Sequence, residues 1–324
     1  MRNHVGQYPS PLFCVDEIEY YRRWRVKILV LINFLDRPHC SPKEMAAIGR
    51  VLSSSGHPHR IVKFTSREQA IHAIEEAERE SFDTLLIGGG DGTIHHIFNL
   101  SFGKGFTYGL IPLGTVSALA RSLRIPNDPT AACRIALLGR ARRIDVGRAA
   151  GRLFVCFGSV GFDASVVHTI DERFKLRWER AAFAVQGVRR LLCLREIAPL
   201  DVEIAPSGES ARGYSLLIGN LPVYAGFRLF SDKIDDGKME ILLFRKNTIR
   251  HYLWGGAKSL ISRRRGGAGD SLLRRADVER VTVRSHRQLF LQLDGEPIPH
   301  RAGEDIIFEV LPRAAAFLVP MMEV

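Results

Sequence analysis

The sequence has few cysteines and no long apolar run. Its five cysteines are scattered over 324 residues without metal-ligand spacing, and their odd number argues against a closed set of disulfides. No stretch approaches the roughly 20 apolar residues that a membrane-spanning helix needs. These absences argue against an integral membrane protein and favour a reducing cytoplasm.

The sequence also lacks internal repeats, low-complexity tracts and a recognisable secretory signal. The first 25 residues mix arginines with acidic residues and contain no apolar segment. We therefore expect residues 1–25 to form an N-terminal extension, ahead of a chain whose 46% hydrophobic content is typical of globular folding.

Positive charge is in excess, with a formal net charge of +11. Arginines cluster at residues 140–143, 189–190, 263–265 and 274–275. Such clusters favour anionic partners. No nucleic-acid-binding motif is present, whereas an anionic lipid surface would attract each exposed basic group by about 1 kcal/mol. The alternative for any one cluster is a solvated basic face.

Strands and helices alternate in the first part of the chain. We expect strands over Val26–Asn33, Arg60–Phe64, Thr84–Ile87 and Tyr108–Ile111. We expect helices over Pro42–Leu52, Arg67–Glu80, a stretch ending near Leu100, Val116–Leu123 and Pro129–Leu138. This alternation predicts a three-layer α/β domain with a parallel sheet over residues 26–140.

Short β-rich segments separated by turns follow from about Arg142. They are Arg152–Phe157, Leu200–Ile204, Tyr214–Asn220, Lys238–Phe244, Val278–Arg284 and Leu289–Leu293, with helices expected over Phe174–Leu194 and His251–Ser262. This pattern predicts a largely antiparallel, β-sandwich-like domain over residues 141–324. We expect Ile306–Val319 to form one or two strands that pack back on the first domain.

The most informative motif is the glycine-rich run Gly88–Thr93, which follows a strand and opens a helix. Glycines allow positive φ and close approach to an anion, and the first N–H groups of a helix favour phosphate. Asp91 could act through a metal ion, and Thr93 could donate a hydroxyl hydrogen bond. The alternative is an ordinary turn. Because ligands bind beyond the carboxyl ends of parallel strands, this turn and Pro112–Thr115 could line one cleft.

Six short motifs occur in order along the chain. They are Gly89–Thr93, Pro112–Thr115, Asp145–Gly147, Gly161–Ala164, Asp235–Lys238 and Asp294–Glu296. Together they resemble the diacylglycerol kinase catalytic-domain family, and within it the bacterial soluble lipid kinases. NAD kinases share the first motif, whereas the other motifs favour the lipid-kinase branch. The resemblance implies an ATP- and Mg²⁺-dependent kinase that phosphorylates a hydroxyl of a lipid, such as diacylglycerol or a sphingosine-like base, at an anionic membrane surface.

The resemblance also implies residue roles. In this family the nucleotide lies in the interdomain cleft, and the matching contact residues are Asn33, Thr65, Gly88, Gly89, Gly90, Asp91, Gly92, Thr93 and Thr115. Glu296 matches the general base that accepts the proton of the lipid hydroxyl, and Asp294 is the second carboxylate of its turn. Asp91 would organise the catalytic Mg²⁺. From sequence chemistry alone, residues 294–296 are a β-turn with solvated acids.

The segment Ser231–Lys238 resembles a loop that holds a second, structural metal ion in bacterial members of the family. The resemblance implies that Asp236 is the side-chain ligand and that the backbone carbonyls of Lys233 and Lys238 are further ligands. Oxygen ligands of this kind suit a hard cation. Without the resemblance, Asp-Asp-Gly is most simply a hairpin turn.

Some positions depart from the family pattern. Residues 34–38 are bulky and lack glycine, Val116 replaces an asparagine, and His95-His96 replace Asn-Glu. Ser117 could replace one hydrogen bond, and a protonated histidine near a phosphate could supply charge. These departures bear on nucleotide choice and turnover rather than on the fold.

Two other functions stay open at this stage: a kinase of a soluble acceptor such as NAD, and a non-catalytic protein that binds a nucleotide or a lipid. We expect a cytoplasmic protein that associates peripherally with the membrane. The sequence leaves the identity of the lipid and the oligomeric state open, with a homodimer as one option.

Overall fold

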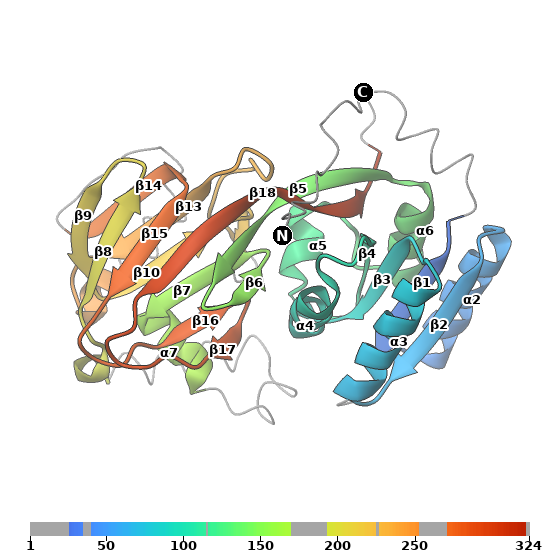
Figure 1. Cartoon of the computed structure of the whole chain (residues 1–324), viewed down its shortest axis with the longest axis horizontal. Coiled ribbons are helices and arrows are strands. Elements are labelled where there is room, and N and C mark those ends of the chain that lie inside the picture. Colours follow the sequence, from blue (N-terminus) through green and yellow to red (C-terminus); the bar gives the residue numbers. More distant parts are fainter. Residues whose placement is uncertain are drawn as a thin grey trace, which may run out of the picture.

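The computed structural model describes residues 26–34, 40–114, 116–169, 193–224, 227–252 and 271–321. Within these residues the strands form a ten-stranded sheet, a six-stranded sheet and a two-stranded hairpin. Figure 1 shows most of the helices gathered on one half of the molecule and a pair of sheets on the other half.

The first half is built on four parallel strands in the order β2-β1-β3-β4. They are β1 (Ile28–Asn33), β2 (His59–Phe64), β3 (Thr84–Gly89) and β4 (Thr107–Pro112). All six residues of β1 are buried, as expected for a strand that is covered on both faces. The four strands agree with the predicted ones to within two residues at each end.

Helices cover both faces of this parallel sheet. They are α2 (Pro42–Ser54), α3 (Arg67–Arg79), α4 (Asp91–Ser101), α5 (Ala118–Ser122) and α6 (Pro129–Leu138). Val30 and Ile32 of β1 belong to the apolar cluster that includes α2 and α6. The alternate residues Leu29 and Leu31 belong to the cluster that includes α3, α4 and α5. The predicted three-layer arrangement is therefore confirmed.

The second half contains two packed sheets. One consists of β14 (Leu272–Val278), β13 (Met239–Phe244), β10 (Ser215–Gly219), β7 (Phe157–Gly161), β16 (Leu291–Leu293) and β17 (Glu296–Ile298). The other includes β18 (Ile306–Val319), β15 (Arg280–Arg284), β8 (Leu200–Ala205) and β9 (Glu209–Gly213). A single apolar cluster fills the space between them, so the antiparallel, sandwich-like prediction is confirmed.

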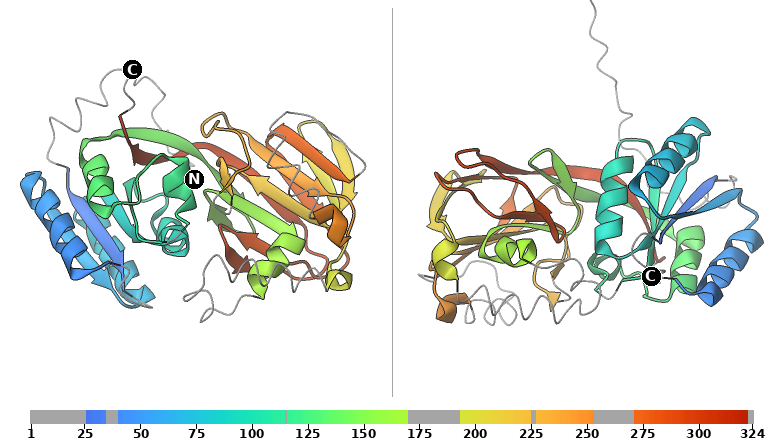
Figure 2. Two further views of the ribbon diagram at one scale, coloured as in Figure 1. Left: turned by 180° about the vertical axis from the view of Figure 1, so that it is seen from behind. Right: turned by 90° about the horizontal axis from the view of Figure 1, so that it is seen from below.

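Two long strands connect the halves. Strand β5 (Arg140–Ala149) pairs with β18 along most of its length, and β6 (Arg152–Phe154) pairs with β5. Phe317 of β18 also pairs with Tyr108 of β4, so one sheet runs through both halves, as Figures 1 and 2 show. The end of β18, with Ala315, Phe317 and Val319, packs into the apolar cluster of the first half.

Three predicted elements differ from the structure. The expected strand Arg152–Phe157 is interrupted after Phe154, and Val278–Arg284 is divided between β14 and β15, which lie in different sheets. The expected helix Val116–Leu123 is shorter because Ser117 has a φ of 49° and helix α5 begins only at Ala118. Each difference lies at a turn that the apolar pattern did not reveal.

Other elements were not predicted. They are β5, β7 and β14 apart from one end residue each, α7 (Phe162–His168), the short helix η1 (Leu194–Glu196), β9, β17, and the hairpin of β11 (Val223–Tyr224) and β12 (Phe227–Arg228). Several of these are polar or too short to show a clear period. Arginines in β5, for example, obscure its apolar residues.

Two predicted helices lie largely outside the described residues. Of Phe174–Leu194 only the last two residues are described, and of His251–Ser262 only the first two, which are helical. The predicted extension over residues 1–25 also lies outside them.

Candidate active site

The glycine-rich turn connects β3 to α4, and Gly90 caps the helix without a side-chain hydrogen bond. Gly88, Gly89, Gly90 and Gly92 all have negative φ, so none of them uses the left-handed conformation that glycine allows. Close packing explains the glycines instead. A Cβ at Gly89 would lie 2.6 Å from the Cβ of Thr93, and a Cβ at Gly88 would lie 3.0 Å from Ile32.

The second turn, after β4, lies directly against the first. A Cβ at Gly114 would be 2.8 Å from the Cα of Gly90, and Leu113 N donates a hydrogen bond to Gly89 O over 3.0 Å. The structure thus brings together the two turns that were expected to line one cleft. Thr115 lies outside the described residues, and Ser117 Oγ donates to Gly114 O over 3.1 Å.

Asn33 and Thr65 extend this group from the ends of β1 and β2. The side chain of Asn33 is buried, and its Nδ2 donates to Thr93 Oγ1 over 2.7 Å. Thr65 is exposed, and its N and Oγ1 both donate to Gln69 Oε1. Asn33 therefore fixes the glycine-rich turn, whereas Thr65 supports the start of helix α3.

The segment Asp294–Glu296 contains a two-residue hairpin between β16 and β17. Asp294 has a φ of 52° and Gly295 a φ of 86°, which is the backbone that an Asp-Gly hairpin favours. Gly295 N donates to Gln292 Oε1 over 2.8 Å. The turn itself follows from the local sequence, but its surroundings do not.

The carboxylate of Asp294 is buried and accepts four hydrogen bonds. The backbone N–H of Val155 donates to Oδ2 over 2.8 Å, and those of Cys156 and Phe157 donate to Oδ1 over 2.8 and 2.9 Å. His95 Nδ1 lies 3.2 Å from Oδ2 and completes the set. A carboxylate has about four acceptor positions. Asp294 is thus suited to hold its turn in place rather than to accept a substrate proton.

Glu296 faces the glycine-rich turn. A Cβ at Gly92 would lie 2.6 Å from Glu296 Oε1, so this carboxylate reaches the first turn of helix α4. Glycine at position 92 leaves the space that the Glu296 side chain occupies. The structure therefore brings together the two motifs that the sequence separates by about 200 residues, the glycine-rich turn and the Asp294–Glu296 turn.

Two titratable groups beside these motifs, His96 and Cys156, have shifted pKa values. Burial and the neighbouring Arg67 and His95 lower the pKa of His96, while the nearby Glu296 raises it. A lowered pKa keeps His96 neutral at pH 7, which does not support the idea that it supplies positive charge. Burial, together with the charges of Asp294 and Asp91, raises the pKa of Cys156 well above its ordinary value. Cys156 is thus a buried thiol beside two carboxylates.

A second carboxylate, that of the half-buried Asp163, belongs to the Gly161–Ala164 motif. It accepts hydrogen bonds from Ser159 Oγ and Tyr224 OH, and Gln292 Nε2 lies 3.4 Å from Oδ2. Burial raises the pKa of Asp163 in spite of these hydrogen bonds. Because Gln292 Oε1 also accepts a hydrogen bond from Gly295 N, this cluster supports the hairpin. Sequence reasoning noted the motif but not this role.

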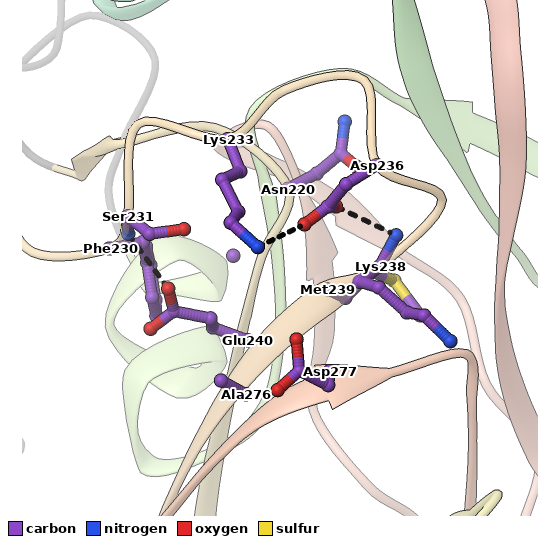
Figure 3. A pocket seen from close by; sticks show the side chains of 11 residues that line it. Asn220, Phe230, Ser231, Lys233, Asp236, Lys238, Met239, Glu240, Ala276 and Asp277 are labelled. Atoms are coloured by element: carbon purple, nitrogen blue, oxygen red, sulfur yellow. Dashed lines mark hydrogen bonds and ion pairs between the residues drawn. The ribbon is translucent and has the colours of Figure 1, made fainter. Parts of the chain in front are cut away.

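The proposed metal loop lines a small cavity of about 10 Å³, which has room for one water molecule or small ion. In Figure 3 the ammonium group of Lys233 points toward the carboxylate of Asp236, with an Nζ–Oδ2 distance of 3.4 Å. Lys238 N donates to Asp236 Oδ1 over 3.1 Å. The acidic side chains of Glu240 and Asp277 also line this pocket.

Asn220 lines the same pocket as the loop of residues 233–238 and also contacts the segment that holds Asp294. Its Nδ2 donates to Asp145 O over 2.8 Å and to Val155 O over 2.7 Å. Its Oδ1 is buried and finds no hydrogen-bond donor among the described residues. An orphaned buried oxygen beside Asp236 fits a cation in this pocket. No group of three or more His, Cys, Asp or Glu side chains suited to a metal ion occurs within the described ranges.

The arginine clusters have different surroundings. Arg274 is buried and pairs with Glu240 over 3.0 Å, and Arg275 forms two hydrogen bonds with Glu209. Arg274 is thus used inside the protein, and the charge of the partly exposed Arg275 is paired with Glu209, so neither residue forms a free basic surface. The clusters at 189–190 and 263–265 lie outside the described residues. Among the helices that the structure describes, none is long and apolar enough to cross a membrane.

Comparison with known proteins gives a consistent family. The diacylglycerol kinase catalytic domain matches residues 27–149. The chain is 26% identical over 261 residues to the diacylglycerol kinase of Bacillus subtilis (strain 168), covering 78% of this chain and 84% of that protein. It is 31% identical over 260 residues to the probable lipid kinase YegS-like of Pseudomonas aeruginosa (strain UCBPP-PA14), covering 76% and 80%.

The fold has close counterparts among solved structures. A crystal structure of a diacylglycerol kinase from Bacillus anthracis str. Sterne superposes with a TM-score of 0.69 and covers 92% of this chain and 97% of that one. The sequence identity in this superposition is 15%, so it concerns the fold. Because it covers 92% of this chain, the superposition extends over both the parallel sheet and the antiparallel sheets.

Proposed function

Because this chain belongs to the diacylglycerol kinase catalytic-domain family, we propose that it is a lipid kinase that transfers the γ-phosphoryl group of ATP to a lipid hydroxyl. The observation that carries the proposal is the approach of Glu296 to Gly92, which joins a general-base candidate to a phosphate-binding turn. Phosphoryl transfer requires mainly such positioning, together with neutralisation of phosphate charge.

The residues of the glycine-rich turn bind the phosphates in this proposal. The N–H groups at the start of α4, which Gly90 caps, present partial positive charge to an anion. Asn33 holds Thr93, and the contact between Gly90 and Gly114 keeps the two turns together. This part of the site is therefore rigid before the nucleotide binds.

Glu296 acts as the general base. It accepts the proton of the lipid hydroxyl as the lipid oxygen bonds to the γ-phosphorus and the bond to the β-phosphate oxygen breaks, which leaves ADP. Asp294 holds the turn through its hydrogen bonds to residues 155–157. The carboxylate of Asp91 is an oxygen ligand of the kind that suits Mg²⁺, and bound Mg²⁺ would neutralise phosphate charge.

The loop at residues 233–238 is the proposed site of a second, structural cation. Asp236 and the orphaned Oδ1 of Asn220 support it, and the carbonyls of Lys233 and Lys238 would complete the oxygen ligands. Peripheral contact with an anionic membrane surface is part of the same proposal, because the acceptor is a lipid and the chain carries a net charge of +11.

The proposal is tested with purified protein, labelled ATP, Mg²⁺ and a panel of lipid vesicles. We expect a labelled lipid with the wild-type protein and about a 100- to 10,000-fold lower rate with Glu296→Gln, since general-base catalysis contributes about this much. Glu304→Gln, at an exposed position, serves as the matched control. Label in NADP instead of lipid would assign a soluble acceptor, and ATP binding without turnover of any acceptor would assign a non-catalytic protein.

A further inference from the structure

His95 lies on helix α4, one turn after Asp91, and its side chain is only 6% exposed. Its Nδ1 is 3.2 Å from Asp294 Oδ2. A carboxylate only accepts hydrogen bonds, so Nδ1 carries the hydrogen, and both the neutral Nδ1–H ring and the imidazolium can provide it. The contact therefore does not depend on the charge of the ring.

The four donors to Asp294 come from two different parts of the chain. Three are the backbone N–H groups of residues 155–157, which lie with Asp294 in the second half. The fourth donor that the described residues provide is His95, which lies on the helix that begins at the glycine-rich turn. Its hydrogen bond thus joins the helix that presents Asp91 and Gly92 to the hairpin that presents Glu296.

Asn99 strengthens this connection one turn further along α4. Its Nδ2 donates to Leu153 O over 3.0 Å and to His95 O over 2.9 Å, and Leu153 N donates to its Oδ1 over 2.9 Å. Helix α4 is therefore tied to β6 just before residues 155–157. The tie fixes both the ring of His95 and the segment that holds Asp294.

We propose that His95 is a positioning residue that sets Glu296 against the phosphate-binding turn by anchoring Asp294 across the two halves of the protein. This inference rests on the proposed kinase function only for its effect on turnover. The ring of His95 faces the carboxylate of Asp294, whose acceptor positions are all occupied. His95 therefore acts through Asp294 and does not itself touch the reacting atoms.

The experiment compares His95→Leu, His95→Asn and Phe98→Leu in the full chain. Leucine has no donor, whereas the Nδ2 of asparagine can take the place of the histidine Nδ1 hydrogen. Phe98 lies on the same helix within an aromatic cluster with Tyr108 and Phe317, so Phe98→Leu is a control for lost packing.

The first measurement is amide hydrogen exchange at residues 155–157, which needs no activity. We expect His95→Leu to speed exchange there by about tenfold or more, since hydrogen bonds to a charged group are among the stronger ones in proteins. His95→Asn should recover part of the protection. Phe98→Leu should have no selective effect at these amides.

The second measurement is lipid kinase turnover together with nucleotide affinity. We expect His95→Leu to lower kcat by about 10- to 100-fold, because a small misplacement of a reacting group has an effect of this size. Affinity for ATP should change less than about twofold, because the glycine-rich turn is intact. His95→Asn should regain part of the lost kcat.

The two measurements separate the proposals. A folded His95→Leu protein with wild-type exchange at residues 155–157 would overturn the positioning role, whatever its activity. Faster exchange in a protein whose wild-type form phosphorylates no lipid would support the anchor and reject the kinase function. Faster exchange with unchanged kcat would show that the anchor is structural and would overturn the proposed role in turnover.

Discussion

The glycine-rich turn and the Asp294–Glu296 turn face each other, but they are held in place in different ways. The first is fixed mainly by shape, because its glycines leave no room for a Cβ beside Thr93 or Glu296, and Asn33 adds one hydrogen bond to Thr93. The second is fixed by hydrogen bonds to Asp294. Val155, Cys156 and His95 provide them and lie 139, 138 and 199 positions away from Asp294 in the sequence. The comparison shows that one wall of a site can depend mainly on its local sequence, while the other wall depends on hydrogen bonds from residues far away in the chain.

This difference predicts that the two turns respond to different perturbations. Added volume should disturb the glycine-rich turn, whereas removal of charge or of a donor should disturb the hairpin. The four predictions that follow test this distinction.

The largest effect is expected for Asp294→Asn. Asparagine tolerates the φ of 52°, so the backbone conformation is kept, but the carboxylate charge that three N–H groups face is lost. We expect the free energy of unfolding to fall by about 3 kcal/mol, since charge-assisted hydrogen bonds contribute about 1.5–3 kcal/mol each. Urea denaturation measures this loss. An unchanged midpoint would show that packing, and not these bonds, holds the hairpin.

The next effect concerns shape and is expected for Gly92→Ala. The new Cβ would collide with Glu296 Oε1 and push a flexible side chain aside, so turnover should fall by about 10- to 100-fold with little loss of stability. Gly49→Ala is the matched control, because a Cβ there meets nothing within 4 Å in helix α2. Gly49→Ala should stabilise the protein by about 0.5–1 kcal/mol. Equal activity of both variants would contradict the placement of Glu296.

The sequence could predict the first wall of the site and the order of its elements. Apolar strands, capped helices and the glycine-rich run indicated a parallel sheet with a phosphate-binding edge, and the Asp-Gly pair indicated a hairpin. These patterns are local, and strand–helix alternation leaves few topologies. The resemblance to lipid kinases then proposed that Glu296 and Asp91 share a cleft.

The second wall could not be predicted because its contacts are long-range. Nothing near His95 in the sequence indicates that it meets Asp294, and Val155–Phe157 was expected to continue a strand. The interruption at that point exposes the N–H groups that bind the carboxylate. Strand β5 was missed for a related reason, because its pairing with β18 outweighs the low apolar content of its first residues.

The third effect is a pH dependence of stability caused by Asp163. Burial raises its pKa above the ordinary value of 3.8, so the folded state holds the proton more tightly than the unfolded state. Its stabilising contribution is complete below the unfolded pKa and is lost as the pH rises through the raised folded pKa. Asparagine cannot ionise. The melting temperature of Asp163→Asn relative to wild type should therefore increase from pH 4 to pH 7.5.

The size of this change follows from the shift, because each pKa unit corresponds to about 1.4 kcal/mol and each kcal/mol to about 2–4 °C. Gly49→Ala should show the same difference from wild type at both pH values, because a Cβ at this position contacts no titrating group. A difference for Asp163→Asn that stays constant or decreases with pH would show that Asp163 is ionised without cost in the folded protein.

The smallest effect is expected for Mg²⁺ at the loop of residues 233–238, which Asn220 connects to the segment that holds Asp294. A ligand that binds only the folded state at ten times its dissociation constant stabilises it by about 1.4 kcal/mol. In the absence of nucleotide, Mg²⁺ should raise the melting temperature of wild type and of Asp91→Asn, but not that of Asp236→Asn. Asp201→Asn, outside this pocket, should behave like wild type. If Asp91→Asn abolishes the shift and Asp236→Asn keeps it, the cation belongs to the glycine-rich turn, and the distant wall is held by protein hydrogen bonds without a metal ion.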